Sequence, residues 1–291
     1  MDSYISFPGL GIEPFHINKV AFSLTIGEHT FSVAWYGILI TFGMLLAVII
    51  AMSLSKYEKI KTDDIADLAI FSILFGVLGS RIYYVIFTWN EFPYLVTNKS
   101  FFENIFLTLK NIIAIWEGGL AIYGGVIGGI LVAIVFSKVK KIRFTRIIDV
   151  LAPCVMVGQI VGRWGNFVNM EAHGGETTLP WRMGLLYGDA ATGTWLTEQY
   201  VHPTFLYESL WNLIGLIILL SIYKKKKFDG RNAAFYFIWY GFGRFLVEGL
   251  RTDSLYIGAL RVSQVVGLVS VVVGILMMIF LKVKKSHKEG E

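Results

Sequence analysis

Long apolar stretches recur along the whole chain, and short polar segments separate them. A helix needs about 20 largely apolar residues to cross the hydrocarbon core of a bilayer. Seven segments meet this requirement, at 33–53, 66–88, 112–137, 147–168, 204–223, 233–250 and 256–281. The pattern therefore predicts an all-α, polytopic membrane protein with seven transmembrane helices, in one membrane-embedded domain over residues 1–291.

The two longest loops of this scheme, 89–111 and 169–203, fall on the same side of the predicted bundle. The second loop is long enough to form a lid or a small extracytoplasmic head. Asp2 and Glu13 replace the basic region of a signal peptide, and no apolar stretch appears before residue 31. We therefore expect no cleavable signal peptide.

The composition agrees with a membrane protein, because 55% of the residues are hydrophobic and only 16% are charged. Soluble domains carry about 25% charged residues. The single cysteine, Cys154, excludes an intramolecular disulfide framework and a cysteine-based metal site. We expect Cys154 to be a small packing residue.

The net charge of +5 is distributed unevenly between the two sides of the predicted bundle. Of the 26 Lys and Arg residues, 17 follow the first, third, fifth and seventh spans, and six lie on the opposite side. Cytoplasmic loops are enriched in Lys and Arg, so the N-terminus is predicted outside and the C-terminus in the cytoplasm. The excess of Lys and Arg is thus explained by the orientation of the chain in the membrane, and we expect no nucleic-acid partner.

Polar residues gather at the outward end of the fourth predicted span. If that helix continues far enough, Arg163 and Asn166 share one face at i, i+3, and Glu171 follows. A guanidinium group beside amide side chains suits an anionic phosphodiester, because it grips oxygen atoms in bidentate fashion. The alternative is an Arg163–Glu171 ion pair that closes the end of the helix.

A second polar group lies in the sixth predicted span. Arg244, Glu248 and Arg251 are spaced i, i+4, i+7, which predicts that they share one helical stripe. Charged residues inside a bundle usually mark water, a ligand or a paired site. A purely structural ladder, with Glu248 neutralising either arginine, is the alternative.

Two further positions are candidates. Tyr123 lies beside the pairs Gly124/Gly128 and Gly125/Gly129, whose small-xxx-small spacing favours close helix packing. Its hydroxyl needs a partner there, and an arginine or a lipid headgroup would serve. His202, at the start of the fifth span, is either a helix-entry cap or a proton carrier. Arg81, in the second span, either binds lipid or pairs with an acidic residue.

The sequence lacks the common catalytic motifs of hydrolases, nucleotide-binding enzymes and zinc proteases. Its five histidines do not have metal-ligand spacing, so no metal site is predicted. Chemistry therefore has to come from the arginines and their neighbours.

The segment 162–175, GRWGNFVNMEAHGG, resembles the signature of prolipoprotein diacylglyceryl transferases, which are bacterial inner-membrane enzymes. The resemblance extends to AWYG at 34–37, GSR at 79–81, the Gly-Gly-Leu…Gly-Gly run of the third span, HPTFLYES at 202–209 and GRFLVEGLR at 243–251. The family has seven spans with the N-terminus outside, in agreement with the topology predicted above.

The resemblance implies a reaction. The diacylglyceryl group of phosphatidylglycerol passes to the thiol of a lipobox cysteine in a prolipoprotein, which forms a thioether and releases glycerol 1-phosphate. The implied partners are phosphatidylglycerol, prolipoprotein signal peptides and membrane lipids. The implied location is the bacterial cell membrane, and neither a metal nor an organic cofactor is implied.

The resemblance also implies roles for the polar residues. Arg163 matches the family's phosphatidylglycerol-binding arginine, and Arg244 matches its second essential arginine. Glu171 and Glu248 are expected to orient these arginines. The implied catalytic residues are Arg163, Arg244, Tyr123, Asn166 and Glu171, and the implied substrate-binding residues are Arg163, Tyr36, Gly174, Glu248, Arg251 and His202.

Tyr123 departs from the family pattern, because many members carry a histidine there that is a candidate base for the thiol. A phenol has an ordinary pKa of about 10 and a thiol one of about 8.5. Tyr123 would act as a base only if adjacent arginines favoured its phenolate. We hypothesise that Tyr123 orients the lipid headgroup, while the positive field or a water molecule assists deprotonation of the thiol.

Two other classes of protein also carry arginines within the membrane. A transporter usually shows matched, broken segments in its two halves, whereas this chain shows no such repeat and its polar residues lie toward the outward side. A non-catalytic protein that binds anionic lipid is the second alternative.

Overall fold

The computed structural model describes residues 2–27, 29–92, 100–189, 192–252, 256–258 and 260–290. Parts of the predicted loops and of the last predicted span, at 93–99, 190–191, 253–255 and 259, lie outside the described residues. The chain divides into two compact units, one comprising Met1–Leu54 with Ile148–Glu291 and the other Ser55–Ile147. The single membrane domain expected from the sequence stays a prediction.

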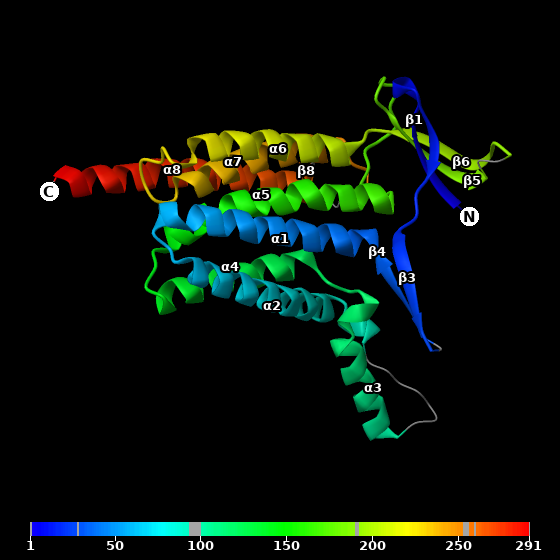
Figure 1. The fold of residues 1–291 in the computed structure, drawn as a ribbon, viewed down its shortest axis with the longest axis horizontal. Helices are drawn as coiled ribbons and strands as arrows, with labels where there is room; N and C mark the ends of the chain where they lie inside the picture. Colours follow the sequence, from blue (N-terminus) through cyan, green and yellow to red (C-terminus); the bar gives the residue numbers. More distant parts are fainter. Residues whose placement is uncertain are drawn as a thin grey trace. The chain divides into compact units, whose positions relative to one another are not determined.

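Seven long helices account for most of the chain (Figure 1). Within the described part of the chain, six of them are long and apolar enough to cross a membrane, and α7 is not among these six. The helical, multi-pass character predicted from the sequence is therefore confirmed, whereas the count of seven spans stays a prediction. The helices are α1 Trp35–Ser55, α2 Thr62–Phe87, α4 Ile122–Val139, α5 Phe144–Asn169, α6 Thr204–Tyr223, α7 Arg231–Glu248 and α8 Val262–Gly290.

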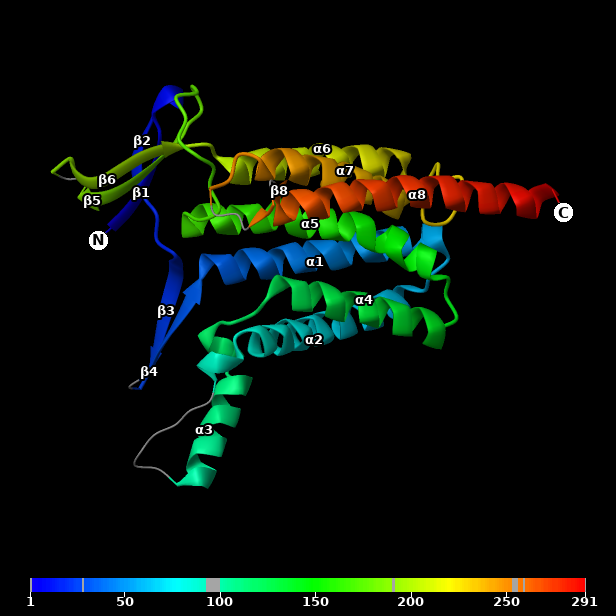
Figure 2. The ribbon, with the colours of Figure 1, turned by 180° about the vertical axis from the view of Figure 1, so that it is seen from behind.

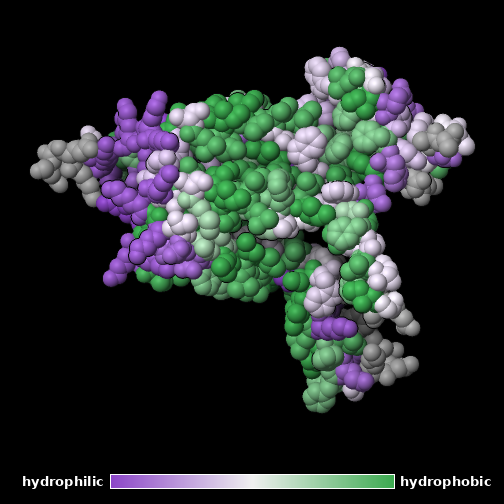
Figure 3. Space-filling view, in the orientation of Figure 1, coloured by the Kyte–Doolittle hydropathy of each residue, from purple (hydrophilic) through white to green (hydrophobic). Residues whose placement is uncertain are grey.

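Hydrophobic side chains cover the outside of the larger unit over α6, and hydrophilic side chains gather near the C-terminal end of that helix (Figure 3). The run Lys224–Lys227 follows α6 immediately. An apolar surface bounded by lysines is what a helix needs when it spans lipid and is anchored by cationic side chains at the headgroups.

The prediction of an all-α chain is wrong, because the larger unit contains a four-stranded antiparallel sheet in the order β2-β1-β5-β6. Its strands are β1 Asp2–Phe7, β2 Ile12–His16, β5 Met183–Asp189 and β6 Thr194–Val201, with the short helix η1 Pro8–Leu10 between the first two. The predicted head at 169–203 thus exists in part as two strands. Its buried side chains pack on the end of α5 and the start of α6, through Ile5, Met170, Met183, Leu185, Val201 and Phe205.

Two small hairpins complete the larger unit. Strands β3 Val20–Ile26 and β4 His29–Ala34 form the first, which leads into α1, and β7 Tyr256–Ile257 and β8 Leu260–Arg261 form the second, which leads into α8. In the first hairpin, Ser23 Oγ lies 2.9 Å from Ser32 Oγ across the strands. Hydroxyl groups thus occupy one face, and exposed apolar side chains such as Phe22 and Leu24 occupy the other.

Helices α6 and α7 are joined by two reciprocal hydrogen bonds. Trp211 Nε1 donates to the carbonyl of Trp239 at 2.9 Å, and Trp239 Nε1 donates to the carbonyl of Trp211 at 2.9 Å. The two indole rings stack with their centroids 4.6 Å apart. A Cβ at Gly215 or Gly243 would lie 2.2 Å from the indole nitrogen of the other helix, so both glycines make room for the exchange.

In the smaller unit, α2 and α4 pack closely along their glycines. A Cβ at Gly124 would lie 2.2 Å from the carbonyl oxygen of Gly79, and one at Gly128 would lie 2.4 Å from that of Phe75. The small-xxx-small prediction of close helix packing is therefore confirmed. Beyond α4, Lys140 Nζ contacts Asp64 at 2.6 Å and Asp67 at 2.9 Å. These hydrogen bonds raise the pKa of Lys140 above its ordinary value.

The prediction for 112–137 is wrong over its first third. A separate helix, α3 Phe101–Ile113, ends there, and the turn η4 Ile115–Glu117 precedes α4. Gly118 and Gly119 adopt positive φ angles of 96° and 69°, a conformation that glycine tolerates and other residues rarely adopt. These two glycines therefore break the apolar run into two helices. The remaining turns of the unit are η2 Lys56–Glu58 and η3 Trp89–Glu91.

Candidate active site

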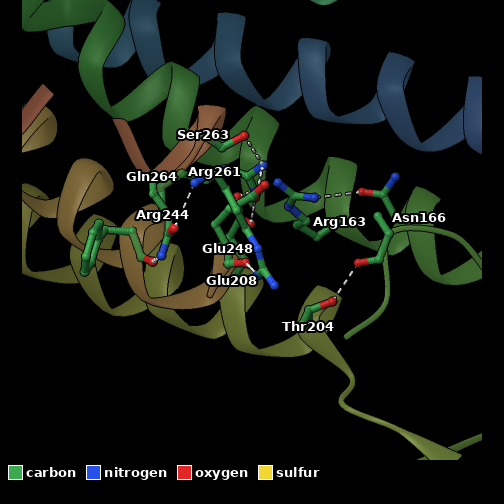
Figure 4. Close-up of polar contacts among 11 residues, drawn as sticks. Arg163, Asn166, Thr204, Glu208, Arg244, Glu248, Arg261, Ser263 and Gln264 are labelled. Carbon is green, nitrogen blue, oxygen red and sulfur yellow. Dashed lines mark hydrogen bonds and ion pairs between the residues drawn. The ribbon is translucent and has the colours of Figure 1, made fainter. Parts of the chain in front are cut away.

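Glu208, on α6, bridges two arginines from neighbouring helices (Figure 4). Its Oε1 accepts from Arg163 Nη2 of α5 at 2.6 Å, and its Oε2 accepts from Arg244 Nη1 of α7 at 2.9 Å. The side chain of Glu208 is only 3% exposed. One buried carboxylate thus holds two guanidinium groups at a fixed separation by charge-assisted hydrogen bonds.

Arg244 has further partners on two helices. Its Nη2 lies 2.7 Å from Glu248 Oε2, one helical turn along α7, and 3.2 Å from Ser263 Oγ on α8. Arg261 donates through Nη1 to the carbonyl of Glu248. Arg163, Arg244 and Arg261 thus lie around the carboxylates of Glu208 and Glu248 (Figure 4).

Arg163 continues the cluster along α5. Its Nη1 donates to Asn166 Oδ1 at 3.2 Å, which confirms that these two residues share a face of the helix. Asn166 Nδ2 in turn donates to Glu171 Oε1 at 2.9 Å, and Asn169 Nδ2 reaches the same oxygen at 3.2 Å. The Arg163–Glu171 ion pair considered from the sequence is not formed; Glu208 takes that place, and Glu171 contacts Arg163 only through Asn166.

The end of α5 turns the chain so that Glu171 faces back toward Asn166. Met170 adopts a positive φ of 54°, and its N–H bonds to the carbonyl of Phe167 at 3.0 Å. The N–H of Glu171 bonds to the carbonyl of Asn166 at 3.0 Å. This pair of bonds is the Schellman arrangement that ends many helices.

The expected stripe Arg244–Glu248–Arg251 is wrong at its last member, because α7 ends at Glu248. Arg251 instead pairs with Gly174 in an isolated antiparallel bridge. The N–H of Gly174 donates to the carbonyl of His202 at 3.0 Å. A Cβ at Gly174 would lie 2.6 Å from His202 Cβ, so only glycine fits where the three segments meet.

His202 does not reach the arginine cluster through its ring. Its Nδ1 lies 3.3 Å from the hydroxyl of Tyr207, which also accepts from Trp181 Nε1 at 2.6 Å. The hydroxyl of Tyr207 thus links His202 and the start of α6 to the segment before β5. The helix-entry cap expected from the sequence is wrong, because Pro203 occupies the N-cap position of α6 and no side chain caps the helix there. Proton transfer by His202 stays untested.

Tyr36 lies at the first turn of α1 and covers Gly165 of α5. A Cβ at Gly165 would lie 2.5 Å from Tyr36 Cδ2, so the ring fills the space of the missing side chain. Gly165 stands between Arg163 and Asn166 in the sequence. The aromatic ring therefore packs directly on the helical turn that carries the polar pair.

Tyr123 and Arg81 belong to the smaller unit. Tyr123 lies in the first turn of α4, half exposed, with its ring centroid 6.2 Å from that of Tyr83. Arg81 is 8% exposed and donates only to backbone carbonyls, those of Asn111, Ile112, Gly118 and Gly119. The acidic partner considered from the sequence is not found for Arg81 among the described residues, and lipid binding by Arg81 stays a prediction.

A comparison with known families shows to which family the chain belongs. Residues 20–280 match the family model described as prolipoprotein diacylglyceryl transferase. The chain belongs to this family. The chain is similar to three curated relatives, each named phosphatidylglycerol–prolipoprotein diacylglyceryl transferase, and each match covers nearly the whole length of both proteins. They come from Listeria monocytogenes serotype 4a (strain HCC23; 44% identical, 95% of this chain, 93% of the relative), Finegoldia magna (strain ATCC 29328; 41%, 91% and 96%) and Streptococcus agalactiae serotype Ia (strain A909; 42%, 91% and 96%).

Within this member of the prolipoprotein diacylglyceryl transferase family, sequence reasoning missed the residue that connects the site. Glu208 was visible in the segment HPTFLYES, yet no role was assigned to it. The available signal was its position, because it is the only acidic residue within 204–223. An ionisable residue inside a span is a functional candidate by default. Ser263 and Arg261, which also contact the cluster, lie at and before the start of α8 and gave no comparable signal.

Proposed function

We propose that this protein transfers the diacylglyceryl group of phosphatidylglycerol to the thiol of a lipobox cysteine in prolipoproteins. The proposal rests on family membership together with one observation, the Arg163–Glu208–Arg244 bridge among helices in the membrane-embedded part of the chain. Names of the relatives state the lipid donor and the protein acceptor. The implied location is the bacterial cell membrane, with the N-terminus outside.

The two arginines keep donors for a phosphate. A guanidinium group has five N–H donors. Among the described residues Arg163 uses one N–H towards Glu208 and one towards Asn166. Glu208 offers one oxygen to each of the two guanidinium groups. A phosphodiester also has two free oxygens, so the same pair of guanidinium groups could bind it in the same way.

The reaction needs positive charge at its leaving group. The thiolate sulfur attacks the glyceryl carbon that carries the phosphoester oxygen, a C–S bond forms, and the C–O bond breaks. The electron pair of the C–O bond stays on the phosphate, and the thiol proton is lost to a base or to water. Donors that are already oriented towards the developing charge are worth about 10²- to 10³-fold in rate each. Arg163 and Arg244 are proposed as these donors.

The remaining predicted residues take supporting roles in this scheme. Asn166 and Glu171 orient Arg163 as a chain of hydrogen bonds, and Glu248 orients Arg244. Gly174 and Arg251 join the segments that follow α5 and α7, next to His202. Tyr36 supports the turn at Gly165. Tyr123 is proposed to orient the headgroup of the lipid.

A transfer assay tests the function. The purified full chain is incubated in nanodiscs with labelled phosphatidylglycerol and a peptide that carries a lipobox cysteine. We expect a labelled thioether product, and a loss of at least about 100-fold for Arg244→Ala. Arg231→Ala removes the same charge from the other end of α7 and is the matched control. Binding of labelled lipid without any product would indicate a lipid-binding protein, and passage of label across vesicles without product would indicate a transporter.

A further inference from the structure

Helix α3 has one apolar face that no described residue of the smaller unit covers. On a helical wheel, Phe101, Phe102, Ile105, Phe106, Leu109, Ile112 and Ile113 fall within one sector of about 140°, and all the polar residues fall outside it. Phe102 is 79% exposed, Phe106 68% and Ile113 64%. Leu107 is the one apolar residue on the opposite side. A face this apolar requires a partner that removes it from water.

The position of α3 indicates what that partner is. Figures 1 and 2 show α3 running across the direction of α2 and α4, near the end of α2 that leads to it. With 13 residues, α3 is about 20 Å long and too short to cross a hydrocarbon core of about 30 Å. An amphipathic helix at the end of a span lies at the depth of the headgroups, parallel to the surface. At the end of α2, Ile86 and Phe87 are exposed to a similar degree, 64% and 70%.

Both ends of α3 are fixed, which gives the helix a defined orientation. At its N-terminus Ser100 and Glu103 form a capping box. At its C-terminus Arg81 donates to the carbonyls of Asn111 and Ile112, at 2.7 and 2.8 Å. These are among the last carbonyls of the helix, which lack partners within the helix and carry partial negative charge.

Arg81 also ties the end of α3 to the loop that enters α4. Its Nη1 donates to the carbonyls of Gly118 and Gly119 at 2.7 and 2.9 Å. A Cβ at Gly119 would lie 2.5 Å from that nitrogen, so the glycine admits the guanidinium group. The loop is four residues from Tyr123. A single buried cation thus connects α2, α3 and the start of α4.

We propose that α3 is an in-plane anchor that inserts its phenylalanine face into the outer surface of the lipid bilayer, and that Arg81 fastens this anchor to α2 and to the loop before Tyr123. The partner is the bilayer itself, at the boundary between headgroups and acyl chains. Trp116, exposed to 70% in the turn after α3, suits the same depth. The proposal concerns membrane attachment and does not depend on the transfer reaction.

Depth-dependent fluorescence quenching tests the proposal on the full chain. Phe106→Cys and Asn104→Cys, made in a Cys154→Ser background, place a polarity-sensitive dye on opposite sides of α3. The protein is reconstituted in nanodiscs of phosphatidylcholine and phosphatidylglycerol whose acyl chains carry bromine near the headgroup end. We expect quenching to be at least about threefold stronger at 106 than at 104.

A second pair keeps the test decisive if either variant fails to fold. Ile105→Cys and Leu107→Cys both replace an aliphatic residue, one on the exposed face and one opposite, so the comparison is free of any effect of residue type. Stronger quenching at 105 supports the anchor. Equal quenching within a pair, stronger quenching at 104 or 107, or no quenching at either position overturns it, and the last result would be expected if a second copy of the chain covered this face.

Discussion

Replacing Glu208 with Gln removes one negative charge from between two guanidinium groups while it preserves the shape of the side chain. The amide retains one acceptor oxygen, so one of the two bonds, of 2.6 and 2.9 Å, loses its acceptor. Arg244 keeps Glu248 at 2.7 Å, whereas Arg163 loses the one carboxylate partner that it has among the described residues. A buried charge that loses its partner costs about 3 kcal/mol of folding free energy. We therefore expect Glu208→Gln to lower the stability by about that amount.

The same change should separate binding from catalysis. Without the bridge the two guanidinium groups lose their common orientation, and we expect kcat to fall about 10- to 100-fold, which corresponds to about 1.4–2.7 kcal/mol of transition-state stabilisation. The KM for phosphatidylglycerol should not rise, because a competing anion has been removed from the site. Glu13→Gln, on the exposed strand β2, makes the same charge change as a control.

Steady-state transfer rates at varied lipid content, together with thermal unfolding in detergent, measure these quantities. A variant with the wild-type kcat and a raised KM would refute the reasoning, because Glu208 would then bind substrate rather than position the arginines. A variant that is as stable as the wild type would show that the bridge contributes no net folding energy.

Three further changes probe other parts of the structure. Gly174→Ala should cost about 1–3 kcal/mol of stability and most of the transfer activity, because its Cβ would lie 2.6 Å from His202 Cβ; Gly175→Ala, with its nearest neighbour at 3.7 Å, is the control in thermal unfolding, and equal effects would contradict the packing argument. Tyr123→Phe should raise the KM for phosphatidylglycerol in the transfer assay if the hydroxyl orients the headgroup; wild-type kinetics would discard that role, and partial rescue by Tyr123→His would support a base. Arg81→Gln should lower stability by about 3 kcal/mol through loss of charge-assisted bonds to four carbonyls, while Lys61→Gln, exposed at the start of α2, should change it by less than about 0.5 kcal/mol; similar unfolding curves for the two would refute the fastening role.

The spans could be predicted from the sequence where strong end signals flank an apolar run. Helix α6 begins and ends where expected, at 204 and 223, because Pro203 precedes it and a lysine run follows. The third span was placed too early, since counting apolar residues does not register the left-handed Gly118 and Gly119. The strands were missed for a related reason. In β3 the apolar residues Phe22, Leu24 and Ile26 alternate with polar ones, a period of two that a long hydropathy window averages away.

The candidate site could be predicted as far as its local pairs. The contact between Arg163 and Asn166 follows from helical spacing alone. The Glu208 bridge joins residues that are 45 and 36 positions apart, on three helices, so only the packing of those helices reveals it. Arg251 was placed wrongly because the spacing rule holds only while the helix continues, and α7 ends three residues earlier.

The exchange of tryptophans between α6 and α7 makes the alignment of these helices an all-or-none property. Because each indole both donates to and lies over the opposite helix, sliding either helix by one residue would break both bonds at once and drive each ring into a side chain instead of a glycine. An alignment that keeps only one of the two hydrogen bonds is therefore not expected. Glu208 lies one turn from Trp211, and Arg244 directly follows Gly243. The ionic contact at the proposed reaction centre is therefore aligned by Trp211, Trp239, Gly215 and Gly243, none of which has to touch a substrate. A substitution at one of these four positions should require a compensating substitution at its partner.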